Sequence, residues 1–127
     1  MQRNLIGALM VSLSSVASVA IANDLRLIDA VKTQDTVVAR ALLARKVDVN
    51  TAQDDGATAL HWVAYWDDLD MATLLIRAGA HVNAANAHGV TPLSLACTNA
   101  STEMIETLLK RIPRVQQLLA MALHVFR

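Results

Sequence analysis

Aromatic residues and cysteine are scarce in this chain of 127 residues, and both shortages restrict the fold. The length allows one domain. Four residues are aromatic although 54% of the sequence is apolar, so the core must be built from Ala, Leu and Val, which favours closely packed helices. The single cysteine, Cys97, cannot close an internal disulfide. Stability must therefore come from packing alone.

An excess of charge of one sign is also lacking. Lys plus Arg and Asp plus Glu both number 11, so no overall field draws the chain toward nucleic acid or an anionic membrane. The sequence contains neither a glycine-rich phosphate loop nor a basic stripe. We therefore expect no nucleic-acid partner and no cofactor.

The first 22 residues have the pattern of an export signal. Arg3 supplies a basic start, residues 5–13 are mostly apolar, and Ala20-Ile21-Ala22 is a small-x-small ending. A retained membrane anchor is the alternative, but about 18 residues with several serines fall short of the ~20 apolar residues of a span. We expect cleavage after Ala22, which leaves an exported protein, periplasmic or secreted, without membrane contact.

The remaining sequence repeats at a period of 33 residues. At this offset Gly56, Thr58 and Leu60 coincide with Gly89, Thr91 and Leu93. Stepping back by the same period places Leu27 under Leu60, and no gap is needed anywhere. Three units in one register, residues 24–52, 53–85 and 86–110, indicate a repeat architecture.

The segments Thr58-Ala59-Leu60-His61 and Gly89-Val90-Thr91-Pro92-Leu93 resemble the ankyrin repeat, whose period is 33 and whose signature is T-P-L-H-x-A. The resemblance covers roughly residues 25–110. It implies an all-α ankyrin solenoid of about three helix-turn-helix units with hairpin-like loops between them. In the family the histidine bonds the threonine side chain and neighbouring backbone, so His61 is expected to be structural.

Local signals support paired helices independently of the resemblance. Thr58 and Thr91 are good N-caps, and Pro92 is tolerated in the first turn of a helix. Gly79 fits the left-handed position past a helix C-terminus. The residues expected to be structural are Gly56, Thr58, His61, Gly79, Gly89, Thr91 and Pro92.

Apolar residues recur at helical spacing within the second unit. Leu60, Val63 and Ala64 follow i, i+3, i+4, and a second helix is indicated by Met71, Leu74, Leu75 and Ala78. Small residues fit where helices approach closely, and we expect Ala64, Ala96 and Cys97 to be buried there. A buried Cys97 would be inert.

The two ends of the array depart from the repeat. In the first unit Leu25 and Ile28 replace the signature Thr and His, as expected of an N-terminal cap. Pro113 ends the second helix of the third unit. The divergent tail, residues 111–127, has the spacing of an amphipathic helix. Two interpretations stay open for it, a C-terminal capping helix or a truncated or frame-shifted end.

The pattern of polar residues does not favour a catalytic site or a metal site. His81 and His88 lie in a loop without a third ligand, which makes a poor zinc site. Asp67, Asp68 and Asp70 lie between the two helices of the second unit, where negative side chains interact favourably with the dipole of the following helix. We expect Asp67 or Asp68 to cap that helix. We expect no catalytic residue and no metal ligand.

Three of the four aromatic residues fall within five positions, at Trp62, Tyr65 and Trp66. Trp62 takes a core position of the repeat, whereas Tyr65 and Trp66 take variable positions that face partners on the concave side in the family. Exposed Trp and Tyr are enriched at binding hot spots. The residues expected to contact a partner are Asp54, Asp55, Ala57, Tyr65, Trp66, Ala87, His88, Val90, Thr98 and Asn99.

The resulting hypothesis is a monomeric, non-catalytic module that binds another protein through its concave face and loop tips. A structural or protective periplasmic protein without one cognate partner is the first alternative. An enzyme that uses the acidic and histidine residues of the second unit is the remote one.

Overall fold

The computed structural model describes residues 22–125. The export signal expected over residues 1–22 lies outside the described residues, apart from Ala22, and so does Phe126. Residues 22–32 are helical and are followed by α2 (Thr36–Ala44), α3 (Ala59–Trp66), α4 (Leu69–Arg77), α5 (Pro92–Thr98), α6 (Thr102–Leu109) and α7 (Pro113–Val125). Within residues 22–125 there is no β-strand, and a single isolated bridge joins Ala52 and Thr58.

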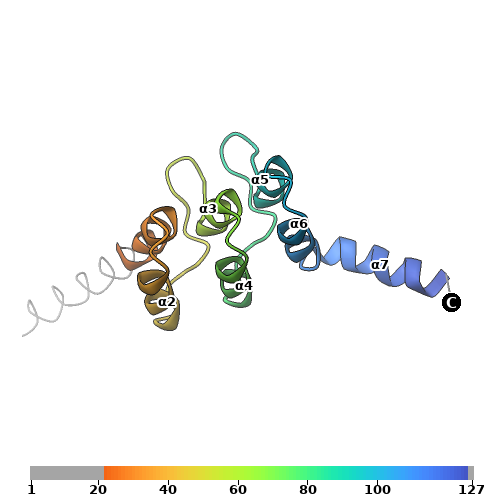
Figure 1. The fold of residues 1–127 in the computed structure, drawn as a ribbon, viewed down its shortest axis with the longest axis horizontal. Helices are drawn as coiled ribbons and strands as arrows, with labels where there is room; N and C mark the ends of the chain where they lie inside the picture. The colour runs from red at the N-terminus through yellow and green to blue at the C-terminus, as the bar shows by residue number, and fades with distance from the viewer. Residues whose placement is uncertain (1–21, 126–127) are drawn as a thin grey trace, which may run out of the picture.

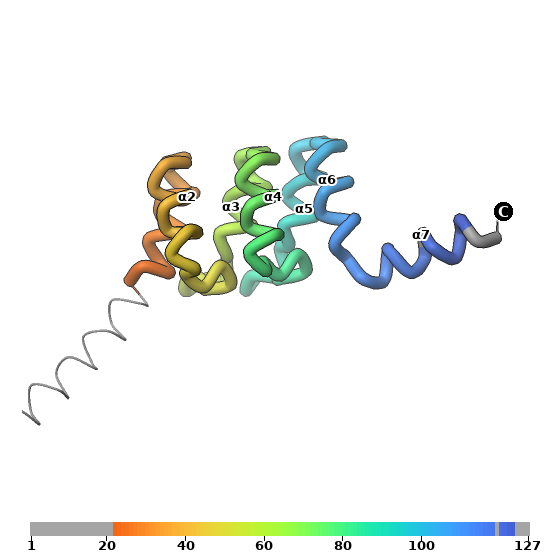
Figure 2. The backbone as a smooth tube through the Cα atoms, turned by 90° about the horizontal axis from the view of Figure 1, so that it is seen from below, coloured from red at the N-terminus to blue at the C-terminus, as the bar shows by residue number. Residues whose placement is uncertain are grey.

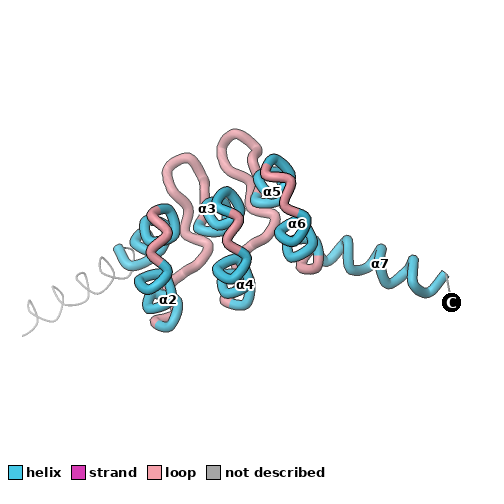
Figure 3. Tube along the Cα trace, in the orientation of Figure 1, coloured by secondary structure: helices cyan, strands magenta, loops and turns pink. Residues whose placement is uncertain are grey.

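The helices form pairs that stack in one row. The helix of residues 22–32 pairs with α2, α3 with α4, and α5 with α6, and the three pairs stand side by side (Figures 1 and 2). Within the row α3 lies against α5, and α4 lies against α6. The connections between successive pairs project from the same side of the row (Figure 3). The prediction of an all-α solenoid of three helix-turn-helix units is confirmed.

The turn inside each helix pair has the same construction in all three units. Residues at a spacing of 33 have positive φ angles, namely Gln34 (60°), Asp67 (58°) and Ala100 (54°). The residue after each of them caps the second helix by accepting a backbone N–H, in the pairs Asp35 with Val38, Asp68 with Met71, and Ser101 with Met104. Such a cap stabilises a helix by ~1 kcal/mol. The predicted capping role is therefore confirmed for Asp68.

The end of α4 is held by a residue of the first unit. Gly79 has φ of 98°, and its carbonyl accepts a hydrogen bond from Asn50 Nδ2 at 3.0 Å. The backbone N–H of His81 donates to Asn50 Oδ1 at 2.8 Å. In the first unit Lys46 takes the place of Gly79 and also has a positive φ, of 56°. The left-handed turn is thus a feature of the repeat and not of glycine alone.

The core is aliphatic and runs continuously through the stack. Its large side chains with at most 2% exposure are Leu27, Ile28, Leu60, Val63, Leu75, Met104 and Leu108. The alanines between them, Ala39, Ala59, Ala64, Ala72 and Ala96, have 0% exposure and let the helices approach closely. Burial of each Leu side chain stabilises the folded state by about 1.5–3 kcal/mol. The few that each unit buries therefore contribute substantially to the stability of the stack.

The expectation that Cys97 is buried is wrong, because its side chain is exposed. One repeat earlier the equivalent residue, Ala64, is completely buried. The difference follows from position in the row. A further helix pair stacks on the second unit and covers Ala64, whereas no described helix pair stacks on the third unit to cover Cys97.

The tail forms α7, which projects from the end of the row (Figures 1 and 2). Leu118, Met121 and Leu123 on this helix are 61%, 66% and 65% exposed. A helix that covered the open face of the third unit would bury such side chains. The capping arrangement considered for residues 111–127 is therefore not the arrangement in this structure, because Pro113 starts a new helix in a different direction.

Candidate partner-binding surface

Two hairpin-like loops project beside α3 and α5, and hydrogen bonds join them. In the first loop the N–H of Gln53 donates to the carbonyl of Ala57 at 2.9 Å, and in the second that of Asn86 donates to Val90 at 2.9 Å. The N–H of Ala87 donates to the carbonyl of Asp55 at 2.8 Å, which ties the loops to each other. The loops therefore form one continuous edge.

Gly56 allows this close approach. Its φ is 81°, and a Cβ built on it would lie 3.1 Å from the Cα of Asn86 and 3.2 Å from the backbone N of Ala87. Both neighbours are backbone atoms of the second loop and cannot rotate away. Only glycine fits here without displacing one loop from the other.

His61 connects the second unit to the second loop. Its Nδ1 accepts the backbone N–H of Thr58 at 3.1 Å and lies 3.0 Å from Thr58 Oγ1. Its Nε2 lies 2.9 Å from the carbonyl oxygen of Val90. A backbone N–H can only donate and a carbonyl can only accept, so the ring that fits is neutral with its proton on Nε2. Since the side chain is 3% exposed, it serves as a link and offers no free nitrogen to a ligand.

The third unit lacks this link. Ser94 occupies the position equivalent to His61, and its Oγ accepts the N–H of Thr91 at 2.9 Å and donates to the Thr91 carbonyl at 2.8 Å. Ser94 and Thr91 together cap α5, and Pro92 begins that helix. Serine is too short to reach beyond its own unit, so these bonds stay local.

Trp62, Tyr65 and Trp66 form a continuous aromatic surface on α3. The ring centroids of Trp62 and Tyr65 are 6.0 Å apart and those of Tyr65 and Trp66 are 5.0 Å apart, both with edge-to-face geometry. Trp62 packs against the core, and its Nε1 donates to Gln53 Oε1 at 2.9 Å. Tyr65 and Trp66 are 52% and 43% exposed. Trp62 is therefore held in place next to the core, and Tyr65 and Trp66 form the accessible part of the aromatic surface.

An open groove of about 390 Å³ lies between this aromatic surface and the loops. Its lining residues are Asp55, Ala57, His61, Trp62, Tyr65, Asn86, Val90 and Leu95. We call it the aromatic groove, with Trp66 extending the aromatic surface beyond it. Most of the lining is apolar, and Asp55 and Asn86 add polar side chains to it.

The structure distributes the residues expected to contact a partner over three environments. Those with exposed side chains are Asp54, Asp55, Tyr65, Trp66, Ala87, His88, Thr98 and Asn99. Val90 is half-buried beside the groove. Ala57 is 6% exposed but lines the aromatic groove, so its contact with a partner stays a prediction. The second loop lies against the first at Asp55, a contact that sequence spacing alone does not reveal.

Asn99 is exposed but has a structural task. Its Nδ2 donates to the carbonyl oxygens of Ala64 and Tyr65, at 3.0 and 2.9 Å. These carbonyls lie in the last turn of α3, where helix carbonyls lack their usual i+4 donors, and that of Ala64 also accepts the N–H of Asp67 at 3.3 Å. Asn99 therefore positions the end of the helix that carries Tyr65 and Trp66.

Four groove residues were not expected to contact a partner, namely His61, Trp62, Asn86 and Leu95. Leu95 lies one repeat after Trp62, so the period relates these two lining residues to each other. Asn86 Oδ1 accepts the N–H groups of His88 and Val90 at 3.0 and 2.9 Å, which shapes the second loop. Its place in the groove depends on contact between the loops and leaves no signal in the sequence.

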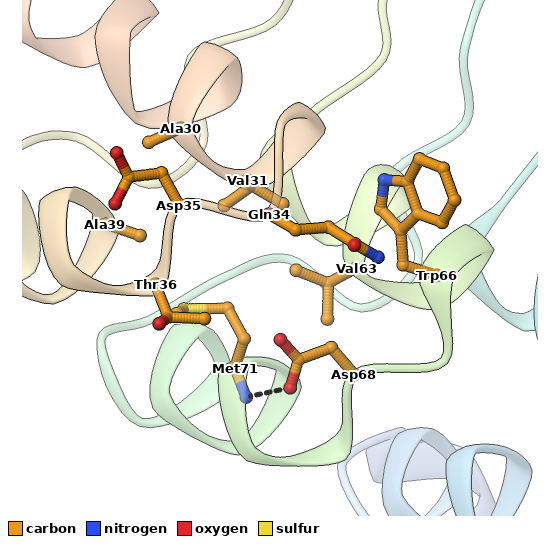
Figure 4. A pocket seen from close by; sticks show the side chains of 10 residues that line it. All are labelled: Ala30, Val31, Gln34, Asp35, Thr36, Ala39, Val63, Trp66, Asp68 and Met71. Carbon is orange, nitrogen blue, oxygen red and sulfur yellow. Dashed lines mark hydrogen bonds between the residues drawn. The ribbon is translucent and has the colours of Figure 1, made fainter.

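A second cavity, between the first two units, is too small for a ligand. Its volume is about 10 Å³, near that of one water molecule. Figure 4 shows Trp66 at one side of it and Asp68 at another, with Asp68 bound to the backbone N–H of Met71. Trp66 thus lines this small cavity although its side chain is 43% exposed.

On the far side of the row, a groove of about 440 Å³ lies between α2 and α4. Its lining includes Arg40 and Arg77 together with leucine and alanine side chains. Over the part of the chain that the structure describes, no cluster of three or more His, Cys, Asp or Glu could hold a metal ion. No helix among the described residues is long and apolar enough to cross a membrane.

Comparison with known proteins gives one family. Residues 27–117 match the family model described as ankyrin repeats, in three copies. Protein phosphatase 1 regulatory subunit 27 of Mus musculus is 31% identical over 93 residues, which cover 72% of this chain and 60% of the relative. The Caenorhabditis elegans ankyrin repeat and LEM domain-containing protein 1 homolog is 40% identical over 67 residues, which cover 53% of this chain and 10% of that protein. The chain thus spans at most 60% of the length of these relatives.

Proposed function

The chain belongs to the ankyrin repeat family, and we propose that it is a non-catalytic module that binds another protein across the aromatic groove and the loop tips. The observation that carries the proposal is the exposure of Tyr65 and Trp66, 52% and 43%, beside an open groove of about 390 Å³. Large apolar rings left accessible next to a concave surface are typical of protein-binding sites.

The scaffold supports this role because it holds the surface in place before a partner arrives. His61 and Asn99 fix the two ends of α3, and the contact between Asp55 and Ala87 fixes the loops. A preorganised surface loses little conformational entropy on binding. One of the relatives is a regulatory subunit by its name, which agrees with a binding role for this chain.

Partner capture tests the proposal. The wild-type protein and the variant Tyr65→Ala with Trp66→Ala are used as baits, and Val37→Ala serves as the matched control. Val37 is an apolar side chain, 76% exposed, on α2 and remote from the groove. We expect a protein that the wild type and Val37→Ala retain and the double variant loses. If the captured protein stays bound to the double variant, the groove is not its site.

We also propose that the protein acts after export, on the strength of the signal pattern in residues 1–22. Intact mass of the protein from its native host decides this point. The expected mass starts at Asn23, and a mass that includes Met1 to Ala22 would mean that the segment is retained.

A further inference from the structure

The overall charge balance conceals a strong local segregation. Between Lys46 and Lys110 the single basic side chain is Arg77, whereas eight are acidic, so residues 47–109 have a formal charge of −7. The acidic residues of this segment are Asp48, Asp54, Asp55, Asp67, Asp68, Asp70, Glu103 and Glu106. Most of this charge belongs to the second unit, residues 53–85, where five acidic residues and Arg77 give a formal charge of −4, although the chain as a whole is neutral.

The one basic residue of this segment does not lie at the aromatic groove. Arg77 lines the groove between α2 and α4 together with Arg40, and these two helices lie on the side of the row away from the loops (Figure 1). None of the residues that line the aromatic groove is Lys or Arg. An anionic partner, including nucleic acid or an anionic membrane surface, would be repelled from this face.

Exposed carboxylates stand at both ends of the aromatic surface. Asp54 and Asp55 are exposed in the first loop, near the start of α3, and Asp67 is exposed directly after its last residue, Trp66. A helix of this length spans about 12 Å at 1.5 Å per residue. Tyr65 and Trp66 therefore lie along a short surface with negative charge at each end.

The structure already holds one cation on this aromatic surface. The ammonium nitrogen of Lys32, from the first unit, lies 4.8 Å from the ring centroid of Trp62. This distance is within the range of a cation–π interaction. Tyr65 and Trp66, which are further out and more exposed, offer rings of the same kind to a cation from another molecule.

We infer that the aromatic groove binds a cationic segment of a partner protein, in which arginine lies beside an apolar side chain; this rests on the proposed function. The guanidinium stacks on Tyr65 or Trp66 within reach of the carboxylates, and the apolar side chain contacts Leu95 and Val90. Arginine suits the site better than lysine because its planar, weakly hydrated group stacks on aromatic rings. Ammonium groups bind the same surface more weakly.

Synthetic peptides test this inference on the full chain. Three amphipathic peptides of about twelve residues, long enough to cover α3 as a helix, combine Leu and Ala with Arg, Lys or Glu. Binding is followed by calorimetry and by tryptophan fluorescence. We expect the arginine peptide to bind several-fold more tightly than the lysine peptide, and the glutamate peptide not to bind. Equal binding of the arginine and glutamate peptides would overturn the inference.

A pair of charge variants separates local contacts from general attraction. Asp54→Asn with Asp67→Asn removes two carboxylates from the ends of the aromatic surface. Glu103→Gln with Glu106→Gln removes two from α6 and is the matched control. We expect the first variant to weaken binding of the arginine peptide by about threefold to tenfold and the control by less than twofold. Equal weakening would show only nonspecific charge attraction and would overturn the proposed site.

The chain's own tail is the competing occupant, because it has Lys110, Arg111 and Arg114 next to exposed apolar side chains of α7. In this structure α7 projects from the end of the row (Figure 2), so the tail of a second copy is the occupant to test. Sedimentation over a range of concentrations detects such pairing. A dimer that the peptide of residues 110–127 dissociates would overturn the inference in favour of self-association.

The failure of this inference is distinguishable from failure of the proposed function. If the arginine peptide does not bind but a natural partner is still lost from Tyr65→Ala with Trp66→Ala, the groove is a binding site of different chemistry. If capture of the partner does not depend on these rings, the proposed function itself fails.

Discussion

His61 and Val90 are separated by 29 residues, yet the Nε2 of His61 donates to the carbonyl oxygen of Val90 at 2.9 Å. The bond joins a helix of the second unit to the loop that precedes the third. With the bonds of the same ring to Thr58, it positions both walls of the aromatic groove. The stability of the stack and the shape of the candidate site therefore depend on the same side chain.

The first prediction concerns His61. His61→Ala leaves the Val90 carbonyl and the Thr58 N–H without these partners in a buried place, and we expect a loss of about 1–3 kcal/mol of unfolding free energy. Urea denaturation measures it. His88→Ala, in an exposed loop, is the control and should change stability by less than ~0.5 kcal/mol. Equal effects of the two variants would show that the link across the units contributes nothing.

The second prediction compares two glycines. Gly79 has φ of 98°, but a methyl group added there would meet no atom within 4 Å, so Gly79→Ala costs only backbone strain, about 1–2 kcal/mol. Gly56→Ala adds a clash with backbone atoms of the second loop at 3.1 Å, so it should destabilise the protein more. Thermal melts followed by circular dichroism rank the variants. The reverse order would mean that the loops separate easily.

The third prediction assigns the two tryptophans. Trp66→Ala should change stability by about 1 kcal/mol or less, because the ring is 43% exposed. Trp62→Ala removes a ring packed against the core and should cost about 3–5 kcal/mol. Acrylamide quenching of the variants Trp62→Phe and Trp66→Phe checks the assignment, since Trp66 should be the more readily quenched. If Trp66 were instead protected from quenching by acrylamide, it would not belong to the proposed binding surface.

The fourth prediction concerns Cys97, whose thiol is exposed at the end of the row. A thiol-specific dye should label it in the folded protein at a rate close to that in denaturant. The variant Ala64→Cys is the matched comparison, because the same repeat position is completely buried there and should react only on unfolding. Slow labelling of native Cys97 would indicate that another surface covers the third unit.

The repeat period and the helix pairs could be predicted because their signals are local. An N-cap such as Thr91 acts within one turn of its own helix, and the turn after α4 requires a left-handed residue whatever packs around it. Apolar spacing gives the inward face of each helix, as at Leu60 and Val63. Caps, turns and helix faces can be predicted because they depend on residues only a few positions apart in the sequence.

Burial at equivalent positions was decided by the tertiary structure. Ala57 and Val90 are one repeat apart, as are Ala64 and Cys97, yet the earlier member of each pair is buried and the later one is less so. The repeat pattern in the sequence predicts the same degree of burial for both residues of a pair. These side chains lose their contact with water where a further unit lies on them. Among residues 22–125 a further helix pair follows the second unit, and none follows the third.

The ankyrin period, the paired helices and the location of the aromatic cluster can all be predicted from the order of the residues. That Asp55, Tyr65 and Leu95 border one groove, and that α7 projects from the end of the row (Figure 2), is seen only in the folded stack. The two groups of features differ in the range of the interactions that produce them. Caps, turns and apolar periodicity act over one or two helical turns, whereas a groove depends on hydrogen bonds and contacts between units about 33 residues apart, such as that of Asp55 with Ala87.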